Sequence, residues 1–141
     1  MARWALEFLI LTAARTSEAL GATWAEMDLE CAIWTIPAER MKAGTEHRVP
    51  LCSRAIHILN TVRPWANGKF IFPSRRGDRP MSNMAMSMLV RQMQKPGITV
   101  HGFRSTFRDF AAEMKELKPA ERKSGHRHFH SLEGAPSAPP W

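Results

Sequence analysis

The chain has 141 residues, of which 44% are apolar, so it is long enough for one domain and too apolar to be disordered throughout. The net charge of +7 and the pI near 10.3 favour a polyanionic partner; nucleic acid is the commonest, although ribosomal and membrane-surface proteins share this balance. Two cysteines without metal-type spacing, and no evident signal peptide, favour a reducing cytoplasm over secretion.

The first 28 residues predict a helix followed by a helical turn. Residues 3 to about 20 predict one helix ending near Gly21, and its apolar run is too short to cross a bilayer. Because this helix starts abruptly on apolar residues, we expect further sequence before it. Residues 23–28 predict a short helical turn, with Thr23 as the cap of a box that Glu26 closes.

Two strands are predicted at residues 32–36 and 47–51, because both segments are rich in β-branched and apolar residues. We expect them to pair antiparallel around a polar loop that has a glycine at its tip. If the register is odd, Trp34 shares a face with Val49. Pro50 lacks an amide hydrogen, which suggests that the second strand has a free edge.

Two further helices are predicted in the middle of the chain. One begins at residue 53 and stops at Pro64, and the other begins at residue 82 or 83, after a basic turn at 74–80. The second helix would place Met84 and Met88 on its apolar side, with Val90 as a further candidate. A methionine stripe at this spacing is more often part of a core than a ligand site, so we expect it to be buried.

The stretch from residue 100 to 110 predicts a helix with two chemically different faces, which Thr99 or Ser105 could cap. One face is cationic and the other is aromatic and expected to be buried: His101, Arg104 and Arg108 against Phe103, Phe107 and Phe110. Arginine can hold two phosphate oxygens at once, and histidine can move a proton near neutral pH, so the cationic face suits a phosphate. The alternative is an amphipathic helix with a solvated basic face.

After Glu113 the character of the chain changes. Residues 115–123 are highly charged and could continue the helix. The rest of the chain is rich in histidine, glycine and proline and predicts a loosely ordered end. We therefore divide the chain into a domain at 1–114 and a divergent, loosely ordered tail at 115–141.

Six motifs follow one another along the chain: Leu11–Glu18, Trp34–Pro37, Met41–Gly44, His47–Leu51, Phe72–Arg75 and His101–Arg108. Together they resemble the catalytic domain of the tyrosine recombinase (phage integrase) family, most nearly the integrases of prophages and genomic islands. Each motif is weak by itself, and their order and spacing carry the resemblance from about residue 4 to 113. It implies an α+β fold that is mainly helical, with a small antiparallel β-sheet or hairpin.

The resemblance implies a role for each of five residues in breaking a DNA phosphodiester. Arg15 and Arg104 would clamp the two non-bridging phosphate oxygens, and Glu18 would orient Arg15. Lys42 would be the general acid for the leaving 5′ oxygen, and His101 would hydrogen-bond the phosphate and assist proton transfer. No metal or cofactor is needed. Taken singly, these residues also fit an ion pair, an ordinary loop lysine and a helix-start histidine.

The resemblance also implies double-stranded DNA as the partner, with other recombinase subunits as further candidates and no membrane. Basic side chains would contact the phosphates: Arg40, Lys42, Arg48, Arg75, Arg76, Arg79 and Arg108. The expected location is the bacterial cytoplasm, at the nucleoid. The alternatives are a non-enzymatic DNA-binding module that regulates an intact recombinase, and a remnant without function.

Two elements of the family pattern are weak or absent after the last predicted helix. The motif of a second catalytic histidine has only faint counterparts, His126 in Ser124-Gly125-His126 and His128, and both also fit a flexible histidine-rich end. The nucleophilic tyrosine has no counterpart, because the sequence contains no tyrosine. We therefore interpret the chain as truncated at both ends, with a frameshift after Glu113 as one cause. We expect that it does not cut and rejoin DNA alone.

Overall fold

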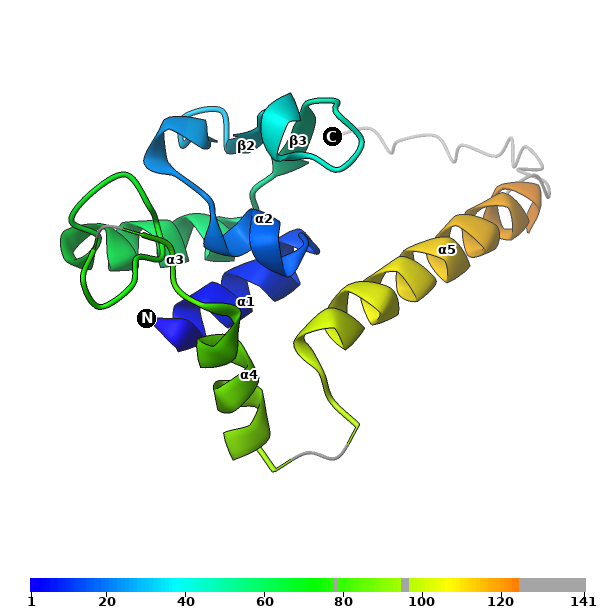
Figure 1. The fold of residues 1–141 in the computed structure, drawn as a ribbon. Helices are drawn as coiled ribbons and strands as arrows, with labels where there is room; N and C mark the ends of the chain where they lie inside the picture. The colour runs from blue at the N-terminus through cyan, green and yellow to red at the C-terminus, as the bar shows by residue number, and fades with distance from the viewer. Residues whose placement is uncertain (78, 95–96, 125–141) are drawn as a thin grey trace, which may run out of the picture. The chain divides into compact units, whose positions relative to one another are not determined.

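The computed structural model describes residues 1–77, 79–94 and 97–124 (Figure 1). The chain divides into two compact units, Met1–Arg108 and Asp109–Trp141. The first unit holds the shorter helices, the sheet and the start of the last helix, α5, which covers Val100–Ser124. Within the described ranges, no helix is both long and apolar enough to cross a membrane.

The helix predicted for residues 3–20 is two helices in the structure, α1 (Ala2–Thr12) and α2 (Thr16–Leu20), so the prediction of one continuous helix is wrong. The break lies at Ala13, whose backbone is left-handed at φ 49°, a conformation that ends a helix. Both helices bury apolar residues in the same core, so the hydrophobic pattern continues across the break and hides it.

A three-stranded antiparallel sheet follows, in the order β1 (Met27–Asp28), β2 (Ile33–Ile36) and β3 (His47–Pro50). The two predicted strands and their antiparallel pairing are confirmed as β2 and β3. Trp34 pairs with Val49, and both side chains are buried, as an odd register requires. Pro50 lies on the edge strand, where a residue without an amide hydrogen is tolerated.

The segment 23–28 contains the short helical turn that was predicted. It forms a single 3-10 turn, η1 (Trp24–Glu26), and then enters β1. The predicted capping box is absent: the Thr23 hydroxyl makes no capping bond to the backbone and donates instead to a carboxylate oxygen of Glu26 at 3.1 Å. A second 3-10 turn, η2 (Ala38–Arg40), leads from β2 into the loop before β3.

The two helices predicted in the middle of the chain are confirmed as α3 (Ser53–Val62) and α4 (Asn83–Gln92), with the 3-10 turn η3 (Arg63–Trp65) after α3. The predicted burial of Met84 and Met88 is wrong, because both are exposed. Met86 is buried instead, together with Val90, whose place on the apolar side is confirmed. Met84 and Met88 have the same spacing of four residues as Met86 and Val90, so the sequence could not decide which methionines face the core.

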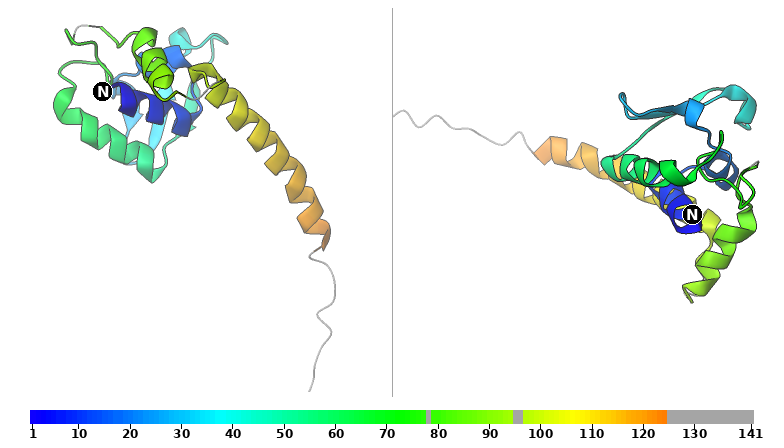
Figure 2. Two further views of the ribbon diagram at one scale, coloured as in Figure 1. Left: turned by 90° about the horizontal axis from the view of Figure 1, so that it is seen from below. Right: turned by 90° about the vertical axis from the view of Figure 1, so that its left-hand side faces the viewer.

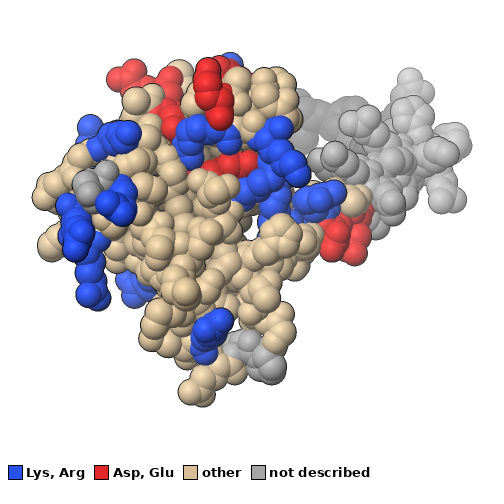
Figure 3. Space-filling view, in the orientation of Figure 1, with Lys and Arg blue, Asp and Glu red and all other residues tan. Residues whose placement is uncertain are grey.

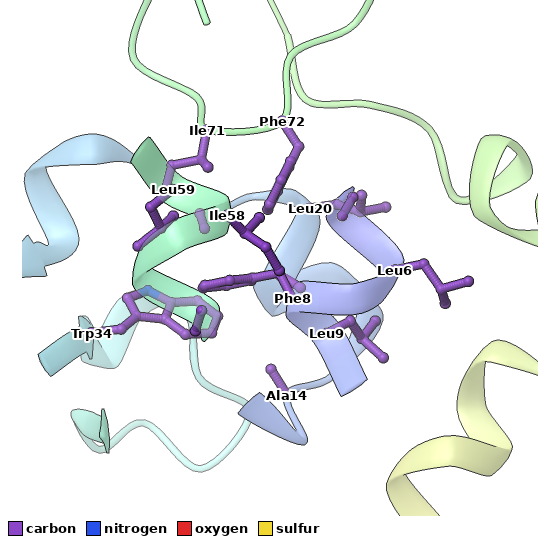
Figure 4. Packing of buried hydrophobic residues seen from close by; sticks show 14 of the residues in the cluster. Leu6, Phe8, Leu9, Ala14, Leu20, Trp34, Ile58, Leu59, Ile71 and Phe72 are labelled. Carbon is purple, nitrogen blue, oxygen red and sulfur yellow. The ribbon is translucent and has the colours of Figure 1, made fainter. Parts of the chain in front are cut away.

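The core of the first unit forms around α1, which packs against α3 and α4 (Figure 1, Figure 2). Its aromatic centre is Phe8, whose ring centroid lies 5.4 Å from that of Trp34 and 5.6 Å from that of Phe72 (Figure 4). The three rings belong to α1, β2 and the segment that follows η3. This contact therefore fixes three distant parts of the chain against one another.

The start of α5 is capped by Thr99, whose hydroxyl oxygen accepts a hydrogen bond from the Gly102 amide at 3.0 Å. Phe103 is partly buried and packs on the core, whereas Phe107 and Phe110 are exposed, so the predicted burial of the aromatic face is wrong at these two residues. The helix continues to Ser124, as the charged sequence predicted. The domain boundary proposed at 114 therefore lies inside α5.

The Phe8→Ala protein should be less stable than the wild type by about 3–5 kcal/mol, because truncating a buried aromatic ring leaves a cavity. The matched control is Trp65→Ala, which removes a larger ring that is 73% exposed and should change stability by about 0.5 kcal/mol or less. Urea unfolding measures both. Equal losses in the two proteins would contradict the packing described for Phe8.

Candidate functional site

The break between α1 and α2 places Arg15 at the start of a helix. Arg15 is the N-cap of α2, and its amide donates to Glu18 Oε2 at 2.7 Å. The carboxylate thus reaches back to hold the start of the helix, as the acidic residue of a capping box does. The Arg15 side chain is 45% exposed at this turn, so it is available to a ligand.

Glu18 is the only buried charged side chain among the described residues, with 4% of its side chain exposed. Arg15 Nη1 donates to Glu18 Oε1 at 2.6 Å. Burial raises the pKa of Glu18, but the hydrogen bonds from the Arg15 amide and guanidinium, with the positive charges of Arg15 and Arg104, outweigh burial and lower it. The carboxylate is therefore ionised at neutral pH and holds Arg15 in place.

Arg104 reaches the same break from the other end of the first unit. It lies near the start of α5, and its Nη1 donates to the backbone carbonyl of Ala13. Because α1 ends at Ala13, this carbonyl has no partner within a helix and is free to accept from a side chain. The structure thus brings together Arg15, Glu18 and Arg104, three of the residues that the sequence assigned to the site.

His101 and Lys42 are exposed, and neither contacts this group. His101 lies one turn before Arg104 on α5, and Lys42 lies in the loop between η2 and β3. In the described part of the chain, no hydrogen bond or ion pair joins Lys42 or His101 to Arg15, Arg104 or Glu18. Of the five residues to which the resemblance assigns a role, Arg15, Glu18 and Arg104 thus meet at the break, while Lys42 and His101 make no contact with them.

A basic cleft of about 360 Å³ lies beside Arg104, between the end of α1, β3 and the start of α5. Arg48 and Arg108, both predicted to bind DNA, line it together with Arg104. His47 also lines the cleft and was not among the predicted site residues. The sequence could have indicated His47 as a site residue, because it lies next to Arg48 at the start of the second predicted strand.

The basic turn at 74–80 carries the remaining predicted DNA contacts, Arg75, Arg76 and Arg79, and all three are exposed. Pairing between Pro73 and Pro80 closes the turn. A larger cleft, of about 710 Å³, lies between this turn, Trp65 and the start of α1, away from the two arginines around Glu18. Volume alone therefore does not identify the site; the convergence of charged side chains does.

Three of the predicted residues remain: Arg40, His126 and His128. Arg40, predicted to contact phosphate, is partly buried and paired with Glu26. His126 and His128 lie outside the described residues. Within the described ranges, no group of three His, Cys, Asp or Glu residues is placed to hold a metal ion.

The sequence of this mainly helical unit, in which two arginines lie near one buried carboxylate, matches a known family. Residues 1–133 match the phage integrase family. The chain belongs to this family, the tyrosine recombinases. The match continues beyond Glu113, so the expectation that the resemblance ends near that residue is wrong.

Two relatives from Escherichia coli K12 confirm the resemblance to prophage integrases. Prophage integrase IntA is 39% identical over 99 residues, which cover 68% of this chain and 24% of the relative. Prophage integrase IntZ is 38% identical over 117 residues, which cover 82% of this chain and 29% of the relative. The chain therefore spans about a quarter of the length of these relatives.

A solved structure confirms the predicted fold class, which is mainly helical with a small antiparallel sheet. The Tn1549 transposon integrase, solved in complex with a circular intermediate DNA, matches with a TM-score of 0.63 at 18% identity. The likeness covers 74% of this chain and 43% of that chain. At this level of identity the likeness concerns the fold alone.

The lowered pKa of Glu18 makes stability depend on pH in a defined direction. The ordinary pKa of a glutamate is about 4.5, so the unfolded chain takes up a proton before the folded chain does as the pH falls. The stabilisation is full above about pH 5 and is lost as the pH falls through the lowered value. Glu18→Gln should therefore be less stable than the wild type at neutral pH and should lose less stability on acidification.

Urea unfolding across this pH range measures the difference. The control is Glu39→Gln, which removes an exposed carboxylate nearby in the chain and should keep the acid dependence of the wild type. Parallel acid curves for the wild type and Glu18→Gln would contradict the stabilising role of the Glu18 carboxylate.

Proposed function

We propose that this chain is the phosphate-binding core of a site-specific DNA recombinase, which holds DNA but does not complete strand transfer alone. The family acts in DNA integration and recombination, and the chain spans about a quarter of its relatives. The observation that carries the proposal is the meeting of Arg15 and Arg104 at the break between α1 and α2, around Glu18.

The hydrogen bonds of the two arginines support their role as a phosphate clamp. A guanidinium has five N–H donors. Arg15 and Arg104 each direct one terminal nitrogen, Nη1, to the protein, and the rest of each guanidinium is free of hydrogen bonds to the described residues. Two such groups could neutralise the non-bridging oxygens of one phosphodiester, where charge develops in the transition state.

Lys42 and His101 are proposed to handle the proton. Both are exposed, and neither has a hydrogen-bond partner among the described residues, so both are available to a substrate. Lys42 would donate a proton to the leaving 5′ oxygen as general acid. His101, one turn before Arg104, would hydrogen-bond the phosphate and assist that transfer. The proposed chemistry uses these side chains alone and needs no metal or cofactor.

Double-stranded DNA is the proposed partner, and arginines outside the clamp would contact its backbone. Arg48 and Arg108 line the basic cleft beside Arg104, and Arg75 and Arg76 lie exposed on the turn at 74–80. Figure 3 shows separate groups of Lys and Arg side chains on one face of the molecule. Such groups attract a polyanion and position it without reading its sequence.

The sequence contains no tyrosine, so the attacking group of the family's reaction must come from elsewhere. We propose that the chain binds a phosphodiester without forming a covalent intermediate. Another recombinase subunit, of different sequence, could supply the nucleophile or could be regulated by competition for the same DNA. The proposed location is the bacterial cytoplasm, at the nucleoid.

Binding to duplex DNA should weaken steeply with salt, because each phosphate contact releases counterions. Arg104→Ala should lower the slope of log affinity against log salt by about one. The matched control, Arg91→Ala, removes an exposed arginine of α4 that does not line the basic cleft, and it should leave the slope unchanged. Fluorescence anisotropy measures the slopes; wild-type binding that is absent or insensitive to salt would sink the proposal.

A suicide DNA substrate, nicked so that a cleaved end diffuses away, should give no covalent complex with this chain, because the attacking tyrosine is missing. Denaturing gel electrophoresis measures the adduct. A tyrosine-bearing integrase run on the same substrate is the positive control. An adduct that survives denaturation of this chain would show that another side chain attacks, and would overturn the claim of binding without cutting.

A further inference from the structure

The Arg40 guanidinium is held by protein atoms. Its Nη1 contacts both carboxylate oxygens of Glu26, and its Nη2 donates to the backbone carbonyl of Glu18 at 2.7 Å. The side chain is 24% exposed. A guanidinium grips a phosphate through a planar fork of donors, and both terminal nitrogens of this fork are already engaged. The surroundings of Arg40 therefore favour a different role from phosphate contact.

Glu26, the partner of Arg40, is itself fixed from the side of the core. Trp34 Nε1 donates to Glu26 Oε2 at 2.9 Å, and the Thr23 hydroxyl donates to Oε1. Trp34 is fully buried on β2, so the carboxylate is anchored to a rigid part of the fold. A partly buried charge pair is stable while all its hydrogen bonds are made and costly once one partner is removed.

Arg40 joins the two segments that carry proposed site residues. It is the last residue of η2, and Lys42 follows in the loop after it. The carbonyl that accepts from Arg40 belongs to Glu18, whose carboxylate holds Arg15. One side chain thus ties the base of the Lys42 loop to α2, the helix that begins at Arg15.

Gly21 is independent support for this contact. Its φ of −84° is open to any residue, so the conformational freedom of glycine is not needed there. A Cβ at this position would lie 2.8 Å from Arg40 Nη2 and 3.0 Å from the Ser17 carbonyl oxygen. The missing side chain leaves room for the guanidinium at the end of α2.

We propose that Arg40 is a positioning residue for the phosphate site: with Glu26, it holds the Lys42 loop against α2, so that Lys42 and Arg15 reach one phosphodiester together. This inference rests on the proposed function. Arg40 touches neither DNA nor the reacting atoms, and it acts through Lys42. A direct phosphate contact, or an ion pair that only stabilises the fold, would behave differently in binding experiments.

Glu26→Gln distinguishes a positioning role of the pair from an effect of surface charge, because the two hypotheses predict opposite changes in DNA affinity. Removing a negative charge from a DNA-binding surface should tighten binding if charge alone matters. If Glu26 and Arg40 position Lys42, Glu26→Gln should instead weaken binding to a nicked duplex by about fivefold or more, which is the loss of a charge-assisted contact. Glu39→Gln, an exposed neighbour with the same change of charge, should bind as tightly as the wild type or tighter.

Arg40→Lys and Gly21→Ala give two further tests, and both keep the net charge. An ammonium group is a point donor and does not span Glu26 and the Glu18 carbonyl as the guanidinium does, so Arg40→Lys should bind as weakly as Arg40→Ala. Gly21→Ala should weaken binding too, because its Cβ displaces the guanidinium. If Arg40→Ala does not fold, these two variants, checked by circular dichroism, decide the question.

A double-mutant cycle identifies Lys42 as the residue through which Arg40 acts. Lys42→Ala should weaken binding in the wild type and change little in the Arg40→Lys background, since the contact is already lost there. Additive losses would mean that the two residues contact DNA independently and would overturn the inference. So would an Arg40→Lys protein that binds like the wild type, or a Glu26→Gln protein that binds as tightly. Failure of the proposed function looks different, because the wild-type protein itself would then show no salt-dependent binding.

Discussion

The buried carboxylate of Glu18 is the interaction on which the rest of the site depends. It accepts hydrogen bonds from the amide and the guanidinium of Arg15, so it starts α2 and orients the arginine at once. A carboxylate in so little solvent is stable only with such partners. The break at Ala13 that permits this geometry also exposes the carbonyl that receives Arg104. Helix capping, charge burial and the meeting of two arginines are therefore one structural event.

A second charged pair supports the same helix from the opposite direction. Arg40 and Glu26 connect the buried indole of Trp34 to the end of α2. Because the aromatic core fixes Trp34 against Phe8, the position of the arginine clamp is set ultimately by apolar packing. Polar networks of this kind contribute orientation more than stability, since their hydrogen bonds are exchanged for bonds to water on unfolding. The arrangement of Arg15, Glu18 and Arg40 is thus set by the packing of the core and completed by a few hydrogen-bonded charges.

In the proposed function, a site of this construction binds a phosphodiester without breaking it. Charge neutralisation and positioning come from the arginines, and these are built into the first unit. The nucleophile is a separate contribution, and the sequence does not supply a tyrosine. The proposal therefore separates binding from bond breaking in this chain. A regulatory role by occupancy of DNA and a role beside a complete recombinase subunit would use the same surface.

The sequence alone determined the class of fold, the family, strands β2 and β3 with their antiparallel pairing, and the candidate arginines, because hydrophobic periodicity and motif order can be read from the sequence itself. It did not determine the break at Ala13, since apolar spacing continues across it, nor which methionines of α4 are buried, since two sets share one spacing. It also gave no sign that Arg40 pairs with Glu26. Only the tertiary structure decided these points, because the partners of Ala13, Glu18 and Arg40 lie far away in the sequence and meet only when the core packs.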